Sequence, residues 1–152
     1  MSHNSDSSIQ KEIELKVIDN LCYIFKIPRQ KVGEGELKVD ETKFQVDFYV
    51  ESMNMYGEIY AGLVEMKSGQ KRKILADMLK LITIEKILRR PIEMYIVFID
   101  KKIHEKFSES SWGARVAKEF AIKLLVVELD DESIKKLKEA KKRQGQQFKT
   151  IK

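Results

Sequence analysis

The sequence predicts an α/β domain in which a mixed β-sheet is flanked by helices, with the elements in the order αββαβαβα. The alternating segment at residues 44–50 is followed, after a turn at residues 54–57, by a second apolar segment at residues 59–66, as expected for an antiparallel hairpin. Two short apolar runs, residues 94–99 and 124–127, are typical of strands that are covered on both faces. Because helical segments separate these strands, we expect part of the sheet to be joined through helices.

Four segments carry apolar residues at helical spacing, and residues that end or cap helices mark their boundaries. Pro28 and Pro91 follow the first two segments, and Ser110 and Ser111 precede the third. The stretch at residues 33–35 shows no strong periodicity and is assigned no element. The predicted helices cover residues 8–25, 71–88, 112–122 and 133–143.

The chain of 152 residues has the length of one ordinary domain, and its 43% share of apolar residues is enough for a single core. Its longest apolar run is far shorter than the roughly 20 residues that cross a bilayer, so no membrane partner is expected. The polar N-terminus lacks an apolar signal region, which predicts a cytoplasmic protein. We expect a disordered N-terminal tail at residues 1–8, a single domain at residues 9–143 and a basic C-terminal tail at residues 144–152.

Positive charge is concentrated near the C-terminus. The net charge is +5, and residues 134–152 contain eight basic residues against one acidic residue. This asymmetry favours nucleic acid or another anionic surface as a partner. The alternative is a solvated helix end followed by a tail. The single cysteine, Cys22, excludes an internal disulfide and a zinc cluster.

The pattern Glu-x-Lys occurs five times, but only one copy lies in an apolar strand. Glu65 and Lys67 close the segment Leu63-Val-Glu-Met-Lys, and the alternation of a strand points both side chains to the same face. Charged groups directed from a buried strand need compensation. This pair is therefore a candidate for chemistry.

Asp47 is the predicted partner of Glu65. A hairpin centred near Tyr56 places the two carboxylates opposite each other, with their Cβ atoms about 4.5–5.5 Å apart. Facing carboxylates repel, and a divalent cation between them removes the repulsion. The alternative is a surface hairpin in which Asp47 pairs with Lys67.

Glu14 lies near the middle of the apolar face of the first predicted helix, beside Ile18 and Leu21. A glutamate on that face needs a partner, which is either a metal at the end of the sheet or a lysine or arginine in a buried salt bridge. Asp100, two residues before Lys102, is a weaker rival of Glu65 because no second acid faces it across a hairpin.

The order of these residues and elements resembles the PD-(D/E)XK nuclease superfamily, which includes restriction endonucleases and Holliday junction resolvases. The resemblance covers roughly residues 9–100 and implies a restriction-endonuclease-like fold. Val46 stands where the family commonly has proline. The helix after Lys67 has no Gln-x-x-x-Tyr motif, which argues against the RecB-like and Cas4-like branches.

The resemblance implies a mechanism that depends on Mg²⁺, with Mn²⁺ as a substitute and no small-molecule cofactor. Asp47 and Glu65 would hold the metal, the Met66 carbonyl and Glu14 would complete its shell, and Lys67 would orient the attacking water. A homodimer is also implied, because such enzymes often cut two strands. Just beyond the site, the candidate contacts to the nucleic-acid backbone are Lys71, Arg72 and Lys73. An ordinary solvated helix start explains these three residues equally well.

We therefore expect a divalent-metal-dependent endonuclease that hydrolyses phosphodiester bonds in DNA. One alternative is a nucleic-acid-binding module of the same fold that does not cleave, and another is a scaffold protein whose basic tail binds elsewhere. The presence of Asp47, Glu65 and Lys67 together favours the enzyme.

Overall fold

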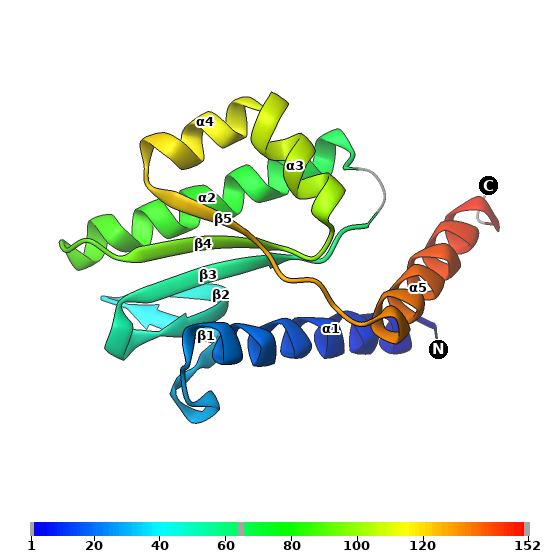
Figure 1. The fold of residues 1–152 in the computed structure, drawn as a ribbon, viewed down its shortest axis with the longest axis horizontal. Helices are drawn as coiled ribbons and strands as arrows, with labels where there is room; N and C mark the ends of the chain where they lie inside the picture. Colours follow the sequence, from blue (N-terminus) through cyan, green and yellow to red (C-terminus); the bar gives the residue numbers. More distant parts are fainter. Residues whose placement is uncertain (1, 64–65, 151–152) are drawn as a thin grey trace.

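A five-stranded mixed sheet lies between two layers of helices, which confirms the predicted α/β class (Figure 1). The computed structural model describes residues 2–63 and 66–150, and the side chains of residues 8–63, 66–109 and 111–143. The strands are β1 (Gly33–Val39), β2 (Thr42–Val50), β3 (Met55–Tyr60), β4 (Glu93–Phe98) and β5 (Ile122–Val126). The helices are α1 (Ser2–Phe25), α2 (Ser68–Leu88), α3 (Lys101–Ser110), α4 (Trp112–Glu119) and α5 (Asp131–Thr150), with 3-10 turns η1 (Arg29–Lys31) and η2 (Glu51–Met53).

The strands lie in their chain order, and the sheet has an antiparallel half and a parallel half. β1 pairs with β2, and β2 with β3, in antiparallel fashion, whereas β3–β4 and β4–β5 are parallel. α2 connects β3 to β4, and α3 and α4 connect β4 to β5. The parallel half therefore has the helical crossovers that parallel strands require.

Apolar stripes on the helices bury the two faces of the sheet. On one face α2 contributes Ile74, Met78, Leu81 and Ile84, whose spacing of three and four residues forms one side of a helix. The opposite face is covered by α1, and α5 packs against α1 (Figure 1). The antiparallel half of the sheet thus lies between α1 and α2, with a separate core on each side.

Two elements were absent from the sequence prediction, so the observed order is αβββαβααβα. In β1 only Leu37 and Val39 are buried, and the glycines and charged residues of this edge strand hide its alternation. In α3 the buried apolar residues are Ile103 and Phe107, too few to give a periodic signal. Asp100 caps α3 by accepting from the backbone N–H of Ile103 at 3.1 Å, which accounts for this rival acid as a helix cap.

The predicted hairpin was wrong in its turn and in its second strand. The chain turns at η2, before the predicted turn at residues 54–57, and Asn54 then adopts the left-handed conformation with φ 50°. β3 is Met55–Tyr60 and not residues 59–66. All six residues of β3 are buried, so the alternation that identifies a half-exposed strand is missing.

The terminal helices extend into the segments that were assigned to tails. α1 begins at Ser2 and α5 ends at Thr150. Within the described part of the chain, no helix has the length and the apolar character needed to cross a membrane.

Candidate functional site

A β-bulge determines where Asp47 lies in β2. The pairing of β1 with β2 shifts by one residue between Gly33 and Gly35. As a result Val46 packs in the core on the α2 side, whereas Phe48 packs in the core on the α1 side, although alternation predicted one face for both. Asp47 lies where the strand changes faces. Bulges of this kind redirect side chains and are frequent next to active sites.

Asp47 faces Glu58 across β2 and β3, and not Glu65 as the sequence predicted. In the antiparallel pairing of the two strands Phe48 lies opposite Gly57, and the next position of the same register places Asp47 opposite Glu58. The backbone N–H of Asp47 donates to Glu58 Oε2 at 3.3 Å, and the backbone N–H of Ile59 donates to Asp47 Oδ2 at 2.7 Å. Both carboxyl groups are therefore fixed by the backbone of the opposite strand.

Glu58 is a carboxyl group in the interior of the protein, with only 3% of its surface exposed. Burial raises the pKa of Glu58, and its hydrogen bond with Asp47 and the negative charge of Asp47 raise the pKa further, to about 9. Burial and the neighbouring carboxylate thus both favour the protonated form of Glu58. Two carboxyl groups held this close together destabilise the fold unless a positive charge compensates them.

Lys80 of α2 supplies the positive charge at this pair. Its Nζ lies 2.5 Å from Glu58 Oε1, 2.7 Å from the carbonyl oxygen of Gln45 and 3.6 Å from Asp77 Oδ1. Burial alone would lower the pKa of Lys80, but the hydrogen bond to Glu58 and the surrounding acidic groups raise it overall. Lys80 is therefore a fixed cation whose position is set by three different elements.

Glu14 and Asp77 extend the acidic group towards the two helix layers. Burial, and then the negative charge of Asp47, raises the pKa of Glu14, which lies half-buried on α1 with Gln10 as a hydrogen-bond partner. Burial also raises the pKa of Asp77 on α2. Lys73 contributes positive charge to both Glu14 and Asp77, so it lies at the edge of the same site.

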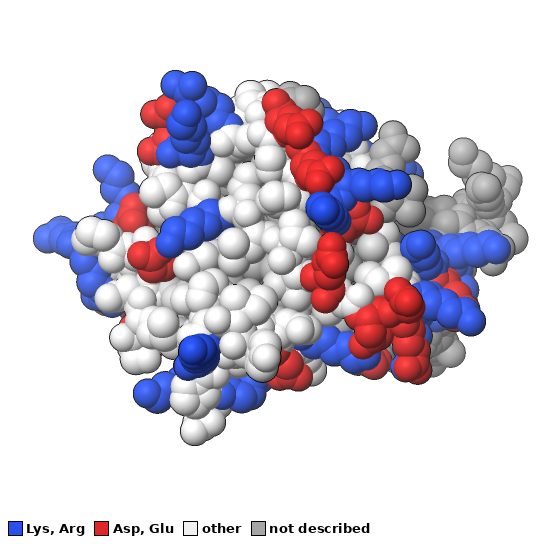
Figure 2. Space-filling model, in the orientation of Figure 1, with Lys and Arg blue, Asp and Glu red and all other residues white. Residues whose placement is uncertain are grey.

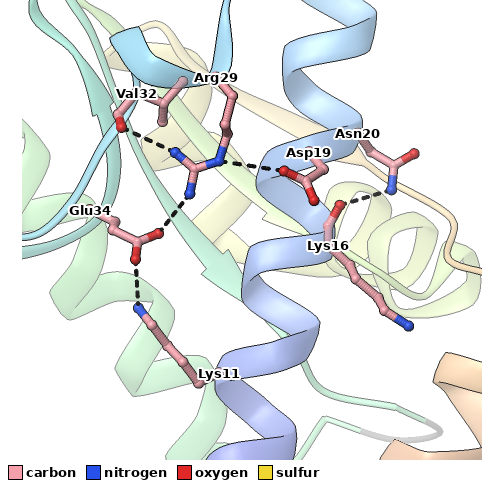
Figure 3. A network of polar contacts seen from close by, with 7 residues as sticks. All are labelled: Lys11, Lys16, Asp19, Asn20, Arg29, Val32 and Glu34. Carbon is pink, nitrogen blue, oxygen red and sulfur yellow. Dashed lines mark hydrogen bonds and ion pairs between the residues drawn. The ribbon is translucent and has the colours of Figure 1, made fainter.

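A network of ion pairs ties β1 to α1 beside the bulge (Figure 3). Arg29 reaches Asp19 of α1, with 3.4 Å between Nε and Oδ1, and donates to Glu34 Oε2 at 3.2 Å. Lys11 of α1 approaches the other oxygen of Glu34, at 3.6 Å. Glu34 lies in β1 at the register shift, so the network holds the bulge against α1.

The structure brings together only some of the residues predicted for the site. Asp47 and Glu14 lie near each other, whereas Glu65 lies outside the described residues. Lys67 is exposed, and its backbone N–H donates to Gln70 Oε1 at 2.8 Å at the start of α2. Met66 is partly buried against the core on the α2 side. The predicted backbone contacts are exposed on the first turns of α2, at Lys71, Arg72 and Lys73.

Sequence reasoning missed Glu58, Asp77 and Lys80. Glu58 is the one charged residue within the otherwise uncharged segment Met55–Tyr60, and that was its available signal. On α2, Lys73, Asp77 and Lys80 recur at helical spacing beside the buried stripe, so charge of alternating sign borders the apolar face. Neither signal identifies the partner of Asp47 without the strand register.

Among the described residues, no three carboxylate, histidine or cysteine side chains are grouped closely enough to hold a metal ion by themselves. Asp47 and Glu58 are thus a pair of oxygen donors without a third acidic ligand in the described part of the chain. Comparisons of the chain with protein-family models, with curated proteins and with solved structures found no match.

Proposed function

We propose that the protein is a divalent-metal-dependent nuclease that hydrolyses phosphodiester bonds in DNA, with Asp47, Glu58 and Lys80 at the reaction centre. The observation that carries this proposal is the pair of opposed carboxyl groups, each held by the backbone of the opposite strand, beside a fixed lysine. The predicted chemistry, two acids and one lysine, is retained, but Glu58 and Lys80 take the roles first assigned to Glu65 and Lys67.

The chemistry of the donors suits Mg²⁺ or Mn²⁺, since both cations prefer carboxylate oxygens. Mg²⁺ is commonly bound through one or two carboxylates together with phosphates of the substrate, so a third acidic ligand is not required. When bound, such an ion lowers the pKa of a coordinated water and neutralises phosphate charge. Asp47 and Glu58 would hold it directly, and Glu14 would act through their charge or through water.

Lys80 is suited to stabilise the negative charge that develops on a phosphate. Its raised pKa keeps the ammonium charged at neutral pH, and the Gln45 carbonyl holds it in place independently of Glu58. Once Glu58 binds a cation, one hydrogen-bonding position of Lys80 becomes free for a phosphate oxygen. Lys73, at the edge of the site, would contact the neighbouring phosphates of the DNA backbone.

Cleavage of duplex, single-stranded and four-way-junction DNA, with and without Mg²⁺, tests the proposal. Asp47→Asn and Glu58→Gln should each lower the rate by several orders of magnitude, because each removes a negatively charged ligand. Glu93→Gln is a matched control, since Glu93 also pairs with a lysine, Lys123, at 2.6 Å, but on the surface. Wild-type rates in Asp47→Asn or Glu58→Gln would show that the reaction does not use these carboxylates.

A second candidate is a DNA-binding module that does not cleave. It is favoured by the absence of a three-residue metal group among the described residues and by the close contact between Lys80 and Glu58. Under this reading DNA binds without Mg²⁺, no DNA substrate is cut, and Glu58→Gln leaves the affinity unchanged.

A further inference from the structure

A concave surface away from the acidic site lies where α2 ends and α4 ends. It is a hollow of about 440 Å³, within the range of small-molecule pockets. Figure 2 shows basic side chains gathered at this end of the molecule. The residues that line the hollow are Ile82, Glu85, Lys86, Arg89, Arg90, Pro91 and Phe120.

Two of the cations at this hollow are available to a ligand. No described carboxylate lies within ion-pair distance of Lys86 or Arg89, and both residues line the hollow. The acid of the hollow is Glu85, whose Oε2 accepts from the backbone N–H of Ile92 at 3.1 Å. Glu85 therefore secures the turn between α2 and β4.

The third cation that lines the hollow, Arg90, is held by a hydrogen bond. The Nε of Arg90 donates to Asn54 Oδ1 at 2.7 Å, so its guanidinium is fixed to the turn before β3. Arg89 ends α2 in the left-handed conformation with φ 54°. The positive charges also offset the negative end of the α2 dipole, a role that requires no ligand. The apolar residues that line the hollow beside these charges are not explained by that role.

Phe120 lines the hollow together with the apolar residues Ile82 and Pro91. Its side chain follows α4 and is 48% exposed, which leaves an aromatic surface open to solvent. α2 and α4 lie side by side, since a Cβ on Gly113 would come within 3.2 Å of Leu75. The aromatic ring and the free cations are thus supported by two packed helices.

We propose that this hollow binds one nucleotide of single-stranded nucleic acid, with the base stacked on Phe120 and the phosphates held by Lys86 and Arg89. Exposed aromatic rings beside basic side chains are the common means of binding single strands without sequence preference. An acidic peptide would satisfy the cations, but it has no general need for an open aromatic surface. The nucleotide uses both features.

This binding site is separate from the proposed hydrolysis and does not depend on it. Lys80 and Arg89 are nine positions apart in the sequence, or about 14 Å along the axis of α2. The carboxyl pair faces β2 and β3, whereas the hollow adjoins α4. Binding to the hollow can therefore be measured without Mg²⁺, when no cleavage is expected.

Fluorescence anisotropy with a labelled oligothymidylate, in the absence of divalent metal, tests the proposal. Phe120→Ala should weaken binding about tenfold or more, because stacking on the ring is lost, and Phe120→Trp should restore it. Lys86→Gln and Arg89→Gln should each reduce the slope of log affinity against log salt by about 0.7. Tyr23→Ala and Lys31→Gln, at exposed residues on another part of the surface, are the controls.

Two results would overturn the proposal. The first is wild-type affinity for oligothymidylate in Phe120→Ala and in the Lys86→Gln/Arg89→Gln double variant. The second is binding of an acidic phenylalanine-containing peptide that depends on Phe120 while the oligothymidylate does not bind. Both measurements leave cleavage aside, so failure of the hydrolytic proposal would not be mistaken for failure of this one.

Discussion

Lys67 and Lys80 differ sharply in their surroundings although only thirteen positions separate them. Lys67 precedes α2, and its side chain is exposed. Lys80 is only 26% exposed and contacts Glu58 of β3, the Gln45 carbonyl of β2 and Asp77 of its own helix. The lysine with the recognisable sequence spacing is therefore the less constrained of the two.

The comparison shows that an acid and a lysine two residues apart do not by themselves define a site. A lysine can stabilise a developing charge only when its position is fixed before the reaction. Lys80 meets this condition because groups from β2, β3 and α2 hold its ammonium in place. The bulge in β2 lies at Asp47, the acid that faces Glu58.

The largest expected effect separates the two lysines directly. Lys80→Gln should lower the rate of Mg²⁺-dependent cleavage by about 10²–10³-fold, because one preorganised donor is lost. Lys67→Gln should stay within a few-fold of the wild type. Lys80→Arg should rescue poorly, since a planar guanidinium does not fit the position of a compact ammonium. Single-turnover cleavage rates at saturating Mg²⁺ measure all three.

Glu65→Gln and Lys123→Gln complete this experiment. Lys123→Gln breaks an exposed pair of similar length and should leave the rate unchanged. If Lys67→Gln and Glu65→Gln lose activity while Lys80→Gln keeps it, the sequence-based assignment of the site is correct and the one built on Glu58 is not.

A smaller effect, on stability, follows from the buried carboxyl pair. The folded protein keeps Glu58 protonated up to a pKa of about 9, whereas the unfolded chain releases this proton near 4.5. Folding therefore takes up a proton between these values, and the free energy of unfolding falls by up to about 1.4 kcal/mol per pH unit across that window. Glu58→Gln, which mimics the neutral acid, should be a few kcal/mol more stable at pH 8 and show a flatter pH dependence.

Urea unfolding of wild type, Glu58→Gln and Glu93→Gln from pH 5 to pH 9 measures this effect. Glu93→Gln should follow the wild-type slope, because Glu93 is exposed. The raised pKa values of Glu14 and Asp77 act in the same direction, so some slope will remain in Glu58→Gln. A wild-type stability that rises with pH over this range would contradict the raised pKa of Glu58.

Much of the fold was predictable because the apolar residues of its helices and strands follow a clear pattern in the sequence. β2, α2, β4 and β5 lie within a few residues of their predicted bounds, since each has a clear apolar pattern. β3 was misplaced because a strand buried on both faces has no alternation, and Met55, Tyr56 and Gly57 then read as part of a turn.

The candidate site was predictable only in part. Asp47 and Glu14 stood out as acids next to apolar patterns, which is a local signal. The partnership of Asp47 with Glu58 depends on strand register, and the bulge that redirects Asp47 depends on the pairing with β1. Lys80 reaches the site only through the packing of α2 on the sheet. All three features depend on contacts between distant segments, so a short stretch of sequence does not predict them.

The smallest expected effect concerns the binding of the metal, and it rests on the same proton. Because Glu58 is protonated below its pKa of about 9, a divalent cation that uses both carboxylates must displace this proton. The affinity for Mg²⁺ should therefore rise with pH between pH 6 and pH 9, by at most about tenfold per unit. Calorimetry in two buffers of different ionisation enthalpy should show close to one proton released per ion at pH 7. Glu93→Gln should keep this proton release and Glu58→Gln should abolish it, since the latter removes the carboxyl group that burial keeps protonated. Binding of Mg²⁺ that is tight and independent of pH would mean that the ion does not engage Glu58, and the ligand pair would have to be sought elsewhere in the chain.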